Sequence, residues 1–224
     1  MEEFNRLSLM IGKDKLEKLH NSTVLIVGLG GVGGYALEAL ARSGVGKFII
    51  VDFDKIEISN INRQIIAFHS TIDKYKTEVF KSRILDINPN CEVIIKNVFY
   101  SDEVKDIWDM DINFAIDAID SIKSKKSFIR ECINRNIKFI SCMGTGRKMD
   151  PSKLEIVEIE KTSYDPIAKI IRKWKKDEKI KEKIMVLSSY EKPIDSLNII
   201  PSNCFVPSVA GILIARYVFL ELIR

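Results

Sequence analysis

The sequence predicts an α/β protein with a doubly wound parallel sheet, because strand-like and helix-like patterns alternate along most of the chain. The run T-V-L-I-V-G over residues 23–28 is short and apolar, as expected of a buried parallel strand. Glycines follow it directly, and an alanine- and leucine-rich helix is predicted over residues 32–42. A second apolar run over residues 48–51 leads to Asp52. These segments predict one βαβ unit.

Later segments continue the alternation, after a helix predicted around residues 12–19. Three further strands and two helices are predicted, at residues 93–96, 114–118 and 138–142 and at residues 73–85 and 123–134. From residue 153 the pattern changes to shorter strands, residues 154–159 and 184–187, on either side of a basic helix. We therefore predict a single domain over residues 1–224, with a core over 20–150 and a C-terminal elaboration over 151–224.

Composition indicates a globular protein with one large core, since 46% of its 224 residues are hydrophobic and 29% are charged. The N-terminus, M-E-E-F-N-R, shows no secretory or transit pattern, so we expect a cytoplasmic protein. The apolar segment 206–223 approaches the ~20 residues of a membrane span. Arg216 and Glu221 interrupt it, so we predict a buried or dimer-interface helix and no membrane. The four cysteines form no C-x-x-C pair, which predicts apolar core residues in place of zinc ligands.

Positive charge is concentrated in residues 169–183, which contain eight Lys or Arg and three Asp or Glu. The net charge of the whole chain is only +4, so the excess is local. Such a segment fits a solvated helix face and a nucleic-acid contact equally well. The charge alone does not decide between them.

A glycine-rich loop, G-L-G-G-V-G-G over residues 28–34, lies between the first predicted strand and the following helix. In this setting backbone N–H groups and the helix dipole bind phosphates, and glycine permits their close approach. Asp52, at the end of the next strand, can hold ribose hydroxyls as in NAD sites. The loop predicts a Rossmann-like nucleotide site and leaves ATP and NAD open. The predicted binding glycines are Gly28, Gly30, Gly31 and Gly33.

A polar loop, S-N-I-N-R-Q over residues 59–64, takes the place where a dehydrogenase would begin its second helix. Asn60 and Gln64 can orient a ligand, and the planar guanidinium of Arg63 matches phosphate oxygens. Lys76 can add a positive charge. Taken singly, Arg63 and Lys76 also fit ordinary surface cations. Together with the glycine loop they favour phosphoryl chemistry over hydride transfer.

Two carboxylates, Asp117 and Asp120, follow the strand predicted over residues 114–118. They are expected at the carboxyl edge of the sheet, where open α/β sheets bind ligands. Asp120 is predicted to bind Mg²⁺ beside a triphosphate, since Mg²⁺ prefers oxygen ligands and keeps several waters. Capping of the helix predicted near residue 122 is an alternative and compatible role for Asp120.

These motifs together resemble the ubiquitin-activating superfamily: G-x-G-G-V-G, D-x-D, S-N-x-N-R-Q, the downstream lysine and D-x-x-D. Three later motifs are similar to those of its tRNA threonylcarbamoyladenosine dehydratase family. They are M-G-T-G-R-K-M-D-P-S-K-L at 143–154, K-T-S-Y-D-P-I-A-K at 161–169 and F-V-P-S-V-A-G at 205–211. The lack of paired cysteines favours this family over relatives with structural zinc. The resemblance extends from Phe4 through the final helix.

The resemblance implies ATP and Mg²⁺ as cofactors and a tRNA carrying threonylcarbamoyladenosine as the substrate. ATP would adenylate the threonyl carboxylate, after which a carbamoyl nitrogen closes a ring with loss of water. Arg63, Lys76 and Asp120 are implied as catalytic, with Arg6 reaching the triphosphate across a homodimer interface. Some relatives carry cysteine where this chain has Asp165, so a cysteine relay there is excluded. A sulfur-transfer protein is implied as a possible partner.

Two other functions would use part of the same residues. Adenylation of the C-terminus of a small ubiquitin-like sulfur-carrier protein would use the same ATP motifs with a different partner. An NAD-dependent oxidoreductase would use the glycines and Asp52 but would leave S-N-I-N-R-Q without a role. If tRNA is the substrate, the basic segment 169–183 would contact its backbone, and Trp174 is predicted to pack in the core.

Overall fold

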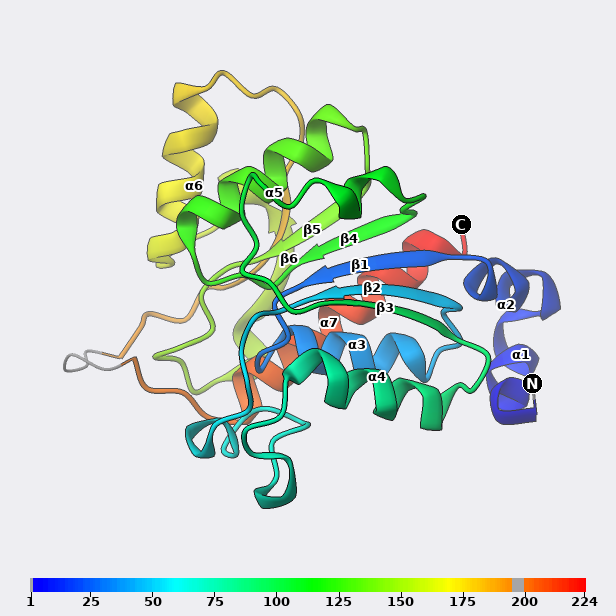
Figure 1. The fold of residues 1–224 in the computed structure, drawn as a ribbon. Coiled ribbons are helices and arrows are strands. Elements are labelled where there is room, and N and C mark those ends of the chain that lie inside the picture. The colour runs from blue at the N-terminus through cyan, green and yellow to red at the C-terminus, as the bar shows by residue number, and fades with distance from the viewer. Residues whose placement is uncertain (1, 195–199) are drawn as a thin grey trace.

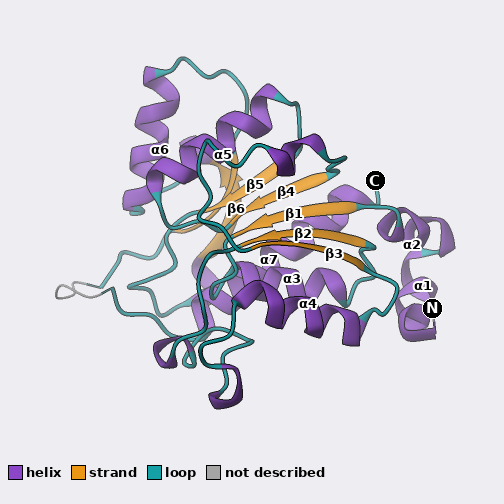
Figure 2. Ribbon diagram, viewed as in Figure 1, coloured by secondary structure: helices purple, strands orange, loops and turns teal. Residues whose placement is uncertain are grey.

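The computed structural model describes residues 2–194 and 200–224 as a seven-stranded sheet with helices on both faces (Figures 1 and 2). The strand order is β3-β2-β1-β4-β5-β7-β6, with β6 antiparallel to β7 and all other pairs parallel. The doubly wound α/β fold is confirmed. The strands are β1 (Thr23–Val27), β2 (Lys47–Val51), β3 (Glu92–Lys96), β4 (Phe114–Asp117), β5 (Phe139–Cys142), β6 (Leu154–Glu158) and β7 (Met185–Ser189). The short C-terminal strands thus extend the same sheet.

The helices form two layers, and two further helices lie at the end of the sheet where the strands begin (Figure 1). One layer contains α3 (Gly33–Ala41), α4 (Lys76–Ile87) and α7 (Phe205–Leu222). The other contains α5 (Ile122–Asn134) and α6 (Pro166–Asp177). The two N-terminal helices are α1 (Asn5–Ile11) and α2 (Lys13–His20). The basic helix is shorter than the charged segment, because α6 ends at Asp177 and residues 178–183 form no helix.

The alternating sides of β1 belong to two different apolar cores. Val24 and Ile26 pack with the layer of α3, α4 and α7, whereas Leu25 and Val27 pack with the layer of α5. This period of two is what a strand buried on both faces requires. A third core joins α5 and α6 and includes Trp174, which is 6% exposed. The prediction that Trp174 packs in the core is confirmed.

Helix α7 is long and apolar enough to cross a membrane by length and composition alone. In the structure it packs against α3, and one side of it is buried. A Cβ on Gly211 would lie 2.4 Å from the Val32 carbonyl oxygen, so glycine permits this close contact. The other side leaves Phe205 and Ile212 exposed. The prediction of a buried helix is therefore confirmed for one face of α7.

Three of the four cysteines are core residues as predicted, and one is not. Cys91, Cys132 and Cys142 are buried. Cys204 is exposed just before α7, with its Sγ 3.5 Å from the Tyr35 hydroxyl. The prediction was wrong for Cys204 because it lies in a loop that crosses the surface instead of in a strand or helix of the core.

The chain order places a crevice between β1 and β4. From β1 the chain runs through α3, β2 and α4 to β3, then returns to β4 on the other side of β1. The loops after β1 and β4 therefore leave the sheet toward opposite helical layers, as α3 and α5 show in Figure 1. Open α/β sheets bind their ligands at such a switch point, outside the carboxyl ends of the strands.

Candidate active site

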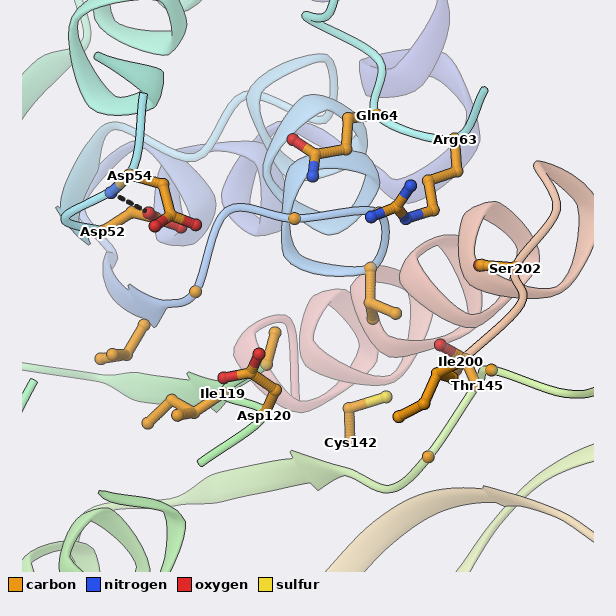
Figure 3. Close-up of a pocket in the computed structure, with 18 of the residues that line it drawn as sticks. Asp52, Asp54, Arg63, Gln64, Ile119, Asp120, Cys142, Thr145, Ile200 and Ser202 are labelled. Carbon is orange, nitrogen blue, oxygen red and sulfur yellow. Dashed lines mark hydrogen bonds between the residues drawn. The ribbon is translucent and has the colours of Figure 1, made fainter. Parts of the chain in front are cut away.

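A pocket of about 780 Å³ occupies this crevice (Figure 3). The loops that follow β1, β2, β3, β4 and β5 all contribute to its walls, together with the start of α6. Asp52 and Asp54 lie on one side, Arg63 and Gln64 on another, and Asp120 across from both pairs (Figure 3). Residues far apart in the sequence thus converge on one cavity, which is large enough for a nucleotide and part of a second ligand.

The glycines of residues 28–34 are required for different structural reasons. Gly28 has φ +91°, and a Cβ there would lie 2.5 Å from the Ala118 carbonyl oxygen. A Cβ on Gly33 would lie 1.8 Å from the Gly28 carbonyl oxygen, and Gly33 does not line the pocket. Glycine at this position permits the packing of α3 on β1, and the phosphate contact of Gly33 stays a prediction. Gly30 is the one glycine of this loop with open space around its Cβ position. The one neighbouring atom there is Gln64 Nε2, at 4.0 Å. Gly31 also lines the pocket.

Asp52 joins the end of β2 to the glycine loop. Its Oδ2 accepts a hydrogen bond from the Leu29 N–H at 2.6 Å, and its Oδ1 accepts one from the Asp54 N–H at 2.8 Å. Burial raises the pKa of Asp52, and the nearby Lys76 opposes that effect. Asp52 lines the pocket, and its contact with a ribose stays a prediction.

Lys76 forms an ion pair that local sequence does not predict. Its Nζ lies 2.6 Å from Asp54 Oδ2 and 3.8 Å from Asp52 Oδ1. The lysine is buried, so the two aspartates compensate its charge in a place with little water. The D-x-D motif in the sequence points to Asp54. It does not show that a lysine 22 residues away lies beside this aspartate.

The loop after β2 brings Asn60, Arg63 and Gln64 to the pocket, as predicted from their spacing. Asn60 Oδ1 accepts a hydrogen bond from the Glu57 N–H at 3.2 Å, which closes a short 3₁₀ turn. The Nη1 of Arg63 donates to the Ser59 carbonyl and to Asn62 Oδ1, each at 2.8 Å. Gln64 Oε1 is buried and accepts no hydrogen bond from residues 2–194 or 200–224. The two hydrogen bonds of Nη1 anchor the Arg63 guanidinium at one nitrogen, and its other N–H donors remain for a ligand.

The two carboxylates after β4 have separate environments. Asp117 is fully buried, where its Oδ2 pairs with Lys125 Nζ at 2.8 Å and its Oδ1 accepts from the Ile119 N–H at 2.9 Å. Asp120 is exposed and lines the pocket. The residue that caps α5 is Ser121, which accepts a hydrogen bond from the Ser124 N–H. The alternative capping role of Asp120 is therefore wrong.

The donor set around Asp120 fits Mg²⁺ held mainly by phosphate and water. No group of three or more acidic, His or Cys side chains that could hold a metal occurs among residues 2–194 and 200–224. The Asp120 carboxylate makes no hydrogen bond or ion pair with any residue of those ranges. Mg²⁺ in nucleotide sites is commonly held by one or two carboxylates together with phosphates. Asp120 is thus the residue that would hold it.

A second part of the pocket follows β5 and borders α6. Lys148 and Asp165 form a buried ion pair there, with 3.0 Å between Lys148 Nζ and Asp165 Oδ2. Lys148 also donates to the Gly144 carbonyl at 2.7 Å, and Asp165 caps α6. Cys142 lines the same region, but burial raises the pKa of its thiol to about 12. A thiol of this kind is no nucleophile at neutral pH.

Arg6 lies in α1, and Figure 1 shows α1 at the end of the sheet where the strands begin, whereas the pocket is lined by the loops that follow the strands. The residue is exposed, and the single chain does not bring it near the nucleotide side. Its predicted contact with a triphosphate therefore depends on a second subunit and stays a prediction.

The sequence model of the ThiF family matches residues 4–185, which include every pocket element up to β7. The chain belongs to the ThiF family. Within this family it is 43% identical over its whole length to a tRNA threonylcarbamoyladenosine dehydratase of Bacillus subtilis, of which it covers 96%. A protein of the same name from Escherichia coli is 34% identical to this chain. The alignment covers 76% of this chain and 64% of that protein.

Solved structures give the same assignment within the ThiF family. The crystal structure of the Escherichia coli dehydratase in complex with ATP superposes with a TM-score of 0.93 at 28% identity. The superposition covers 99% of this chain and 93% of the other. A complex of that enzyme with AMP gives the same TM-score. These likenesses confirm the family resemblance derived from the motifs.

Proposed function

We propose that this protein uses ATP to dehydrate threonylcarbamoyladenosine in tRNA, and that residues 1–224 act as one adenylating domain. The observation that carries the proposal is the division of one pocket into two parts. One part follows β1, β2 and β4 and presents Gly30, Arg63 and Asp120. The other follows β5 and offers space beside Thr145 and Arg147. The full-length relative named for this dehydration supports the assignment.

The reaction takes place in two steps, and neither step requires a nucleophile from the enzyme. The threonyl carboxylate attacks the α-phosphorus of ATP, which forms an acyl adenylate and releases pyrophosphate. A carbamoyl nitrogen of the same nucleoside then attacks the acyl carbon, loses its proton and expels AMP. The ring therefore gains one C–N bond, and the nucleoside loses one water overall. The second step is intramolecular, so correct positioning supplies much of its rate.

In this proposal the pocket residues bind and orient ATP. Gly30 and Gly31 contact the phosphates, Asp52 the ribose, and Asn60, Gln64, Arg63 and Lys76 orient the phosphates. Asp120 would hold Mg²⁺, which would neutralise phosphate charge and make the reacting phosphorus more electrophilic. Arg63 places a fixed positive charge where negative charge develops during the first step. Arg6 of a second subunit adds a further cation in a homodimer.

The proposal is tested by mass spectrometry of nucleosides from tRNA that carries threonylcarbamoyladenosine. Purified protein, ATP and Mg²⁺ are expected to remove one water from the modified nucleoside, under mild conditions that keep the product ring intact. No water should be lost when ATP is omitted. ATP-binding protein that leaves the nucleoside unchanged would contradict the proposal. Labelled pyrophosphate exchange with sulfur-carrier proteins would then test the alternative function.

The exposed lysines of α6 and the following turn are proposed to contact the tRNA backbone. Of the eight cations in residues 169–183, Arg172 donates to the Thr162 carbonyl, and two lysines pair with Glu160 and Glu158. The remaining five are exposed without an ion pair to a described residue: Lys169, Lys173, Lys176, Lys179 and Lys181. Backbone contacts by such lysines give affinity that falls with salt and ignores sequence.

Reversing Lys169, Lys173 and Lys176 to glutamate is expected to weaken tRNA binding and to flatten its dependence on salt. Loss of three phosphate contacts should reduce the slope of log K against log salt by roughly 2 to 3. ATP affinity should stay unchanged. The matched control reverses Lys81, Lys105 and Lys138, which are also exposed but lie outside α6 and the pocket. Equal losses in both triple variants would contradict a specific role for α6.

Four further properties belong to the proposal and have their own measurements. We expect a homodimer, which light scattering of the purified protein would detect, and a cytoplasmic location, which cell fractionation would detect. A sulfur-transfer protein is a possible partner, to be tested by co-purification. The first half of the reaction is a ligase-type adenylation, which pyrophosphate release would follow directly.

A further inference from the structure

Arg147, in the loop after β5, has a backbone conformation that its side chain does not favour. Its φ is +61°, in the left-handed region that glycine adopts without cost. Two hydrogen bonds fix the residue there: its N–H donates to the Pro201 carbonyl at 2.9 Å, and its carbonyl accepts from the Ile194 N–H at 2.8 Å. Strained residues of this kind concentrate at functional sites, where the surrounding structure holds them in place.

Position in the pocket distinguishes Arg147 from the other strained residues. Non-glycine residues with positive φ also occur at Asp73, Asn136, Tyr164 and Lys179 within residues 2–194 and 200–224. Asp and Asn tolerate this conformation comparatively well. None of these four lines the pocket, whereas Arg147 does. The strained arginine is therefore the one that faces a ligand cavity.

The guanidinium of Arg147 has donors without acceptors. Its Nε is fully buried and donates a hydrogen bond to no described residue. No hydrogen bond or ion pair joins its side chain to any residue of the described ranges. A guanidinium carries five N–H donors in a planar fork, and a buried donor left unpaired is unfavourable. These donors indicate an acceptor supplied by a ligand.

The charges around Arg147 favour an anion as that ligand. The neighbouring Lys148 is neutralised by Asp165, and both side chains are buried. Among the described pocket residues after β5, Arg147 is thus the charge that remains without a counter-ion. Arg63 and Lys76 already serve the nucleotide part in the proposed function. The anion left for Arg147 is the one on the second substrate.

We propose that Arg147 binds the threonyl carboxylate of the tRNA substrate and so selects the acid for adenylation. A planar fork matches a carboxylate in a bidentate pair. The cyclised product has no carboxylate, so the same contact is lost when the reaction is complete. Arg147 therefore distinguishes substrate from product and favours release of the product. This inference rests on the proposed function, because it takes threonylcarbamoyladenosine as the substrate.

The test compares two anticodon stem-loop RNAs in the absence of ATP, so that no turnover occurs. One carries threonylcarbamoyladenosine, and the other carries its carboxamide in place of the carboxylate. The parent protein is expected to bind the acid about 10- to 100-fold more tightly, the range for hydrogen bonds to charged groups. In Arg147→Gly the preference should fall below about 3-fold, while affinity for the carboxamide and for ATP stays unchanged. Arg147→Lys should restore part of the preference, because it keeps the charge without the fork.

Folding is not expected to obscure the result. Glycine adopts the left-handed conformation freely, so Arg147→Gly should unfold at a temperature no lower than the parent protein. Lys138→Gln serves as the control for loss of one positive charge, since Lys138 is exposed and pairs with Glu221 outside the pocket. This control should keep the full preference for the acid.

Each other outcome overturns the assignment. An undiminished preference in Arg147→Gly means that another residue binds the carboxylate. Equal losses for acid and carboxamide indicate a contact to RNA, and a loss of ATP affinity indicates a contact to the nucleotide. If the parent protein removes water from the nucleoside but binds both RNAs equally, the role of Arg147 is refuted and the proposed function stands. A parent protein that neither removes water nor prefers the acid refutes the proposed function as well.

Discussion

Arg63→Ala is expected to lower the rate of ATP-dependent water loss about 10²- to 10³-fold, the usual effect of removing one fixed donor from a reacting oxyanion. Pyrophosphate release should fall by the same factor, because the proposed function places Arg63 in the adenylation step. The physical reason is the anchoring of its Nη1 by the Ser59 carbonyl and Asn62 Oδ1, which points the remaining donors in a fixed direction. A preorganised cation needs no rearrangement when charge develops on the phosphate.

The folded state should not depend on Arg63, which separates this effect from unfolding. Its side-chain hydrogen bonds to the described residues stay within its own loop, so the melting temperature is expected to change little. Arg42→Ala provides the matched control, since Arg42 is largely exposed at the end of α3 and, among the described residues, pairs only with Glu38. Turnover close to that of the parent in a folded Arg63→Ala variant would remove Arg63 from the mechanism.

Lys125→Ala is expected to destabilise the protein by about 3 to 5 kcal/mol, because it leaves a buried carboxylate without its counter-ion. Lys125 and Asp117 are both 0% exposed. The lysine also donates to the Cys142 carbonyl at 2.8 Å and to Ser141 Oγ at 3.4 Å, which joins α5 to the ends of β4 and β5. For a chain of this size the melting temperature should fall by roughly 6 to 20 °C. Thermal unfolding followed by circular dichroism would measure it.

Two further variants show whether the unpaired charge is the cause. Lys123→Ala removes an exposed lysine from the same helix and should change stability by less than about 0.5 kcal/mol. Lys125→Met combined with Asp117→Val removes both charges and should recover much of the loss, since apolar pairs can replace buried ion pairs. A double variant as unstable as Lys125→Ala would show that packing, and not the unpaired carboxylate, dominates.

The ion pair between Lys125 and Asp117 also links the stability of the fold to the active site. The second oxygen of Asp117 accepts the hydrogen bond of the Ile119 N–H, directly before Asp120. The sequence places both aspartates at the carboxyl edge of the sheet and favours Asp120 as the one that faces the ligand. Their different exposure agrees with that choice. Lys125 was not identified, because a lysine on a helix with several lysines carries no local sign of burial.

Local sequence determined the alternation of strands and helices, the glycine loop and the polar loop with Arg63. These features depend on neighbours in the chain: apolar periodicity fixes the element type, and short spacings fix which residues follow a strand. The predicted boundaries lie within a few residues of the observed ones, as for β4 (Phe114–Asp117) and α5 (Ile122–Asn134). The resemblance to the ubiquitin-activating superfamily followed from the same local motifs, and the match to the ThiF family confirms it.

The tertiary structure alone decided how distant residues pair. Lys76 with Asp54, Lys148 with Asp165 and Lys125 with Asp117 lie 22, 17 and 8 positions apart. Which carboxylate each lysine meets depends on how strands and helices pack, because a charge is paired or left free by its three-dimensional surroundings. The packing role of Gly33 and the unpaired guanidinium of Arg147 arise in the same way. The sequence thus specified the fold and the nucleotide edge, whereas packing specified which of the charged residues remain free to bind a ligand.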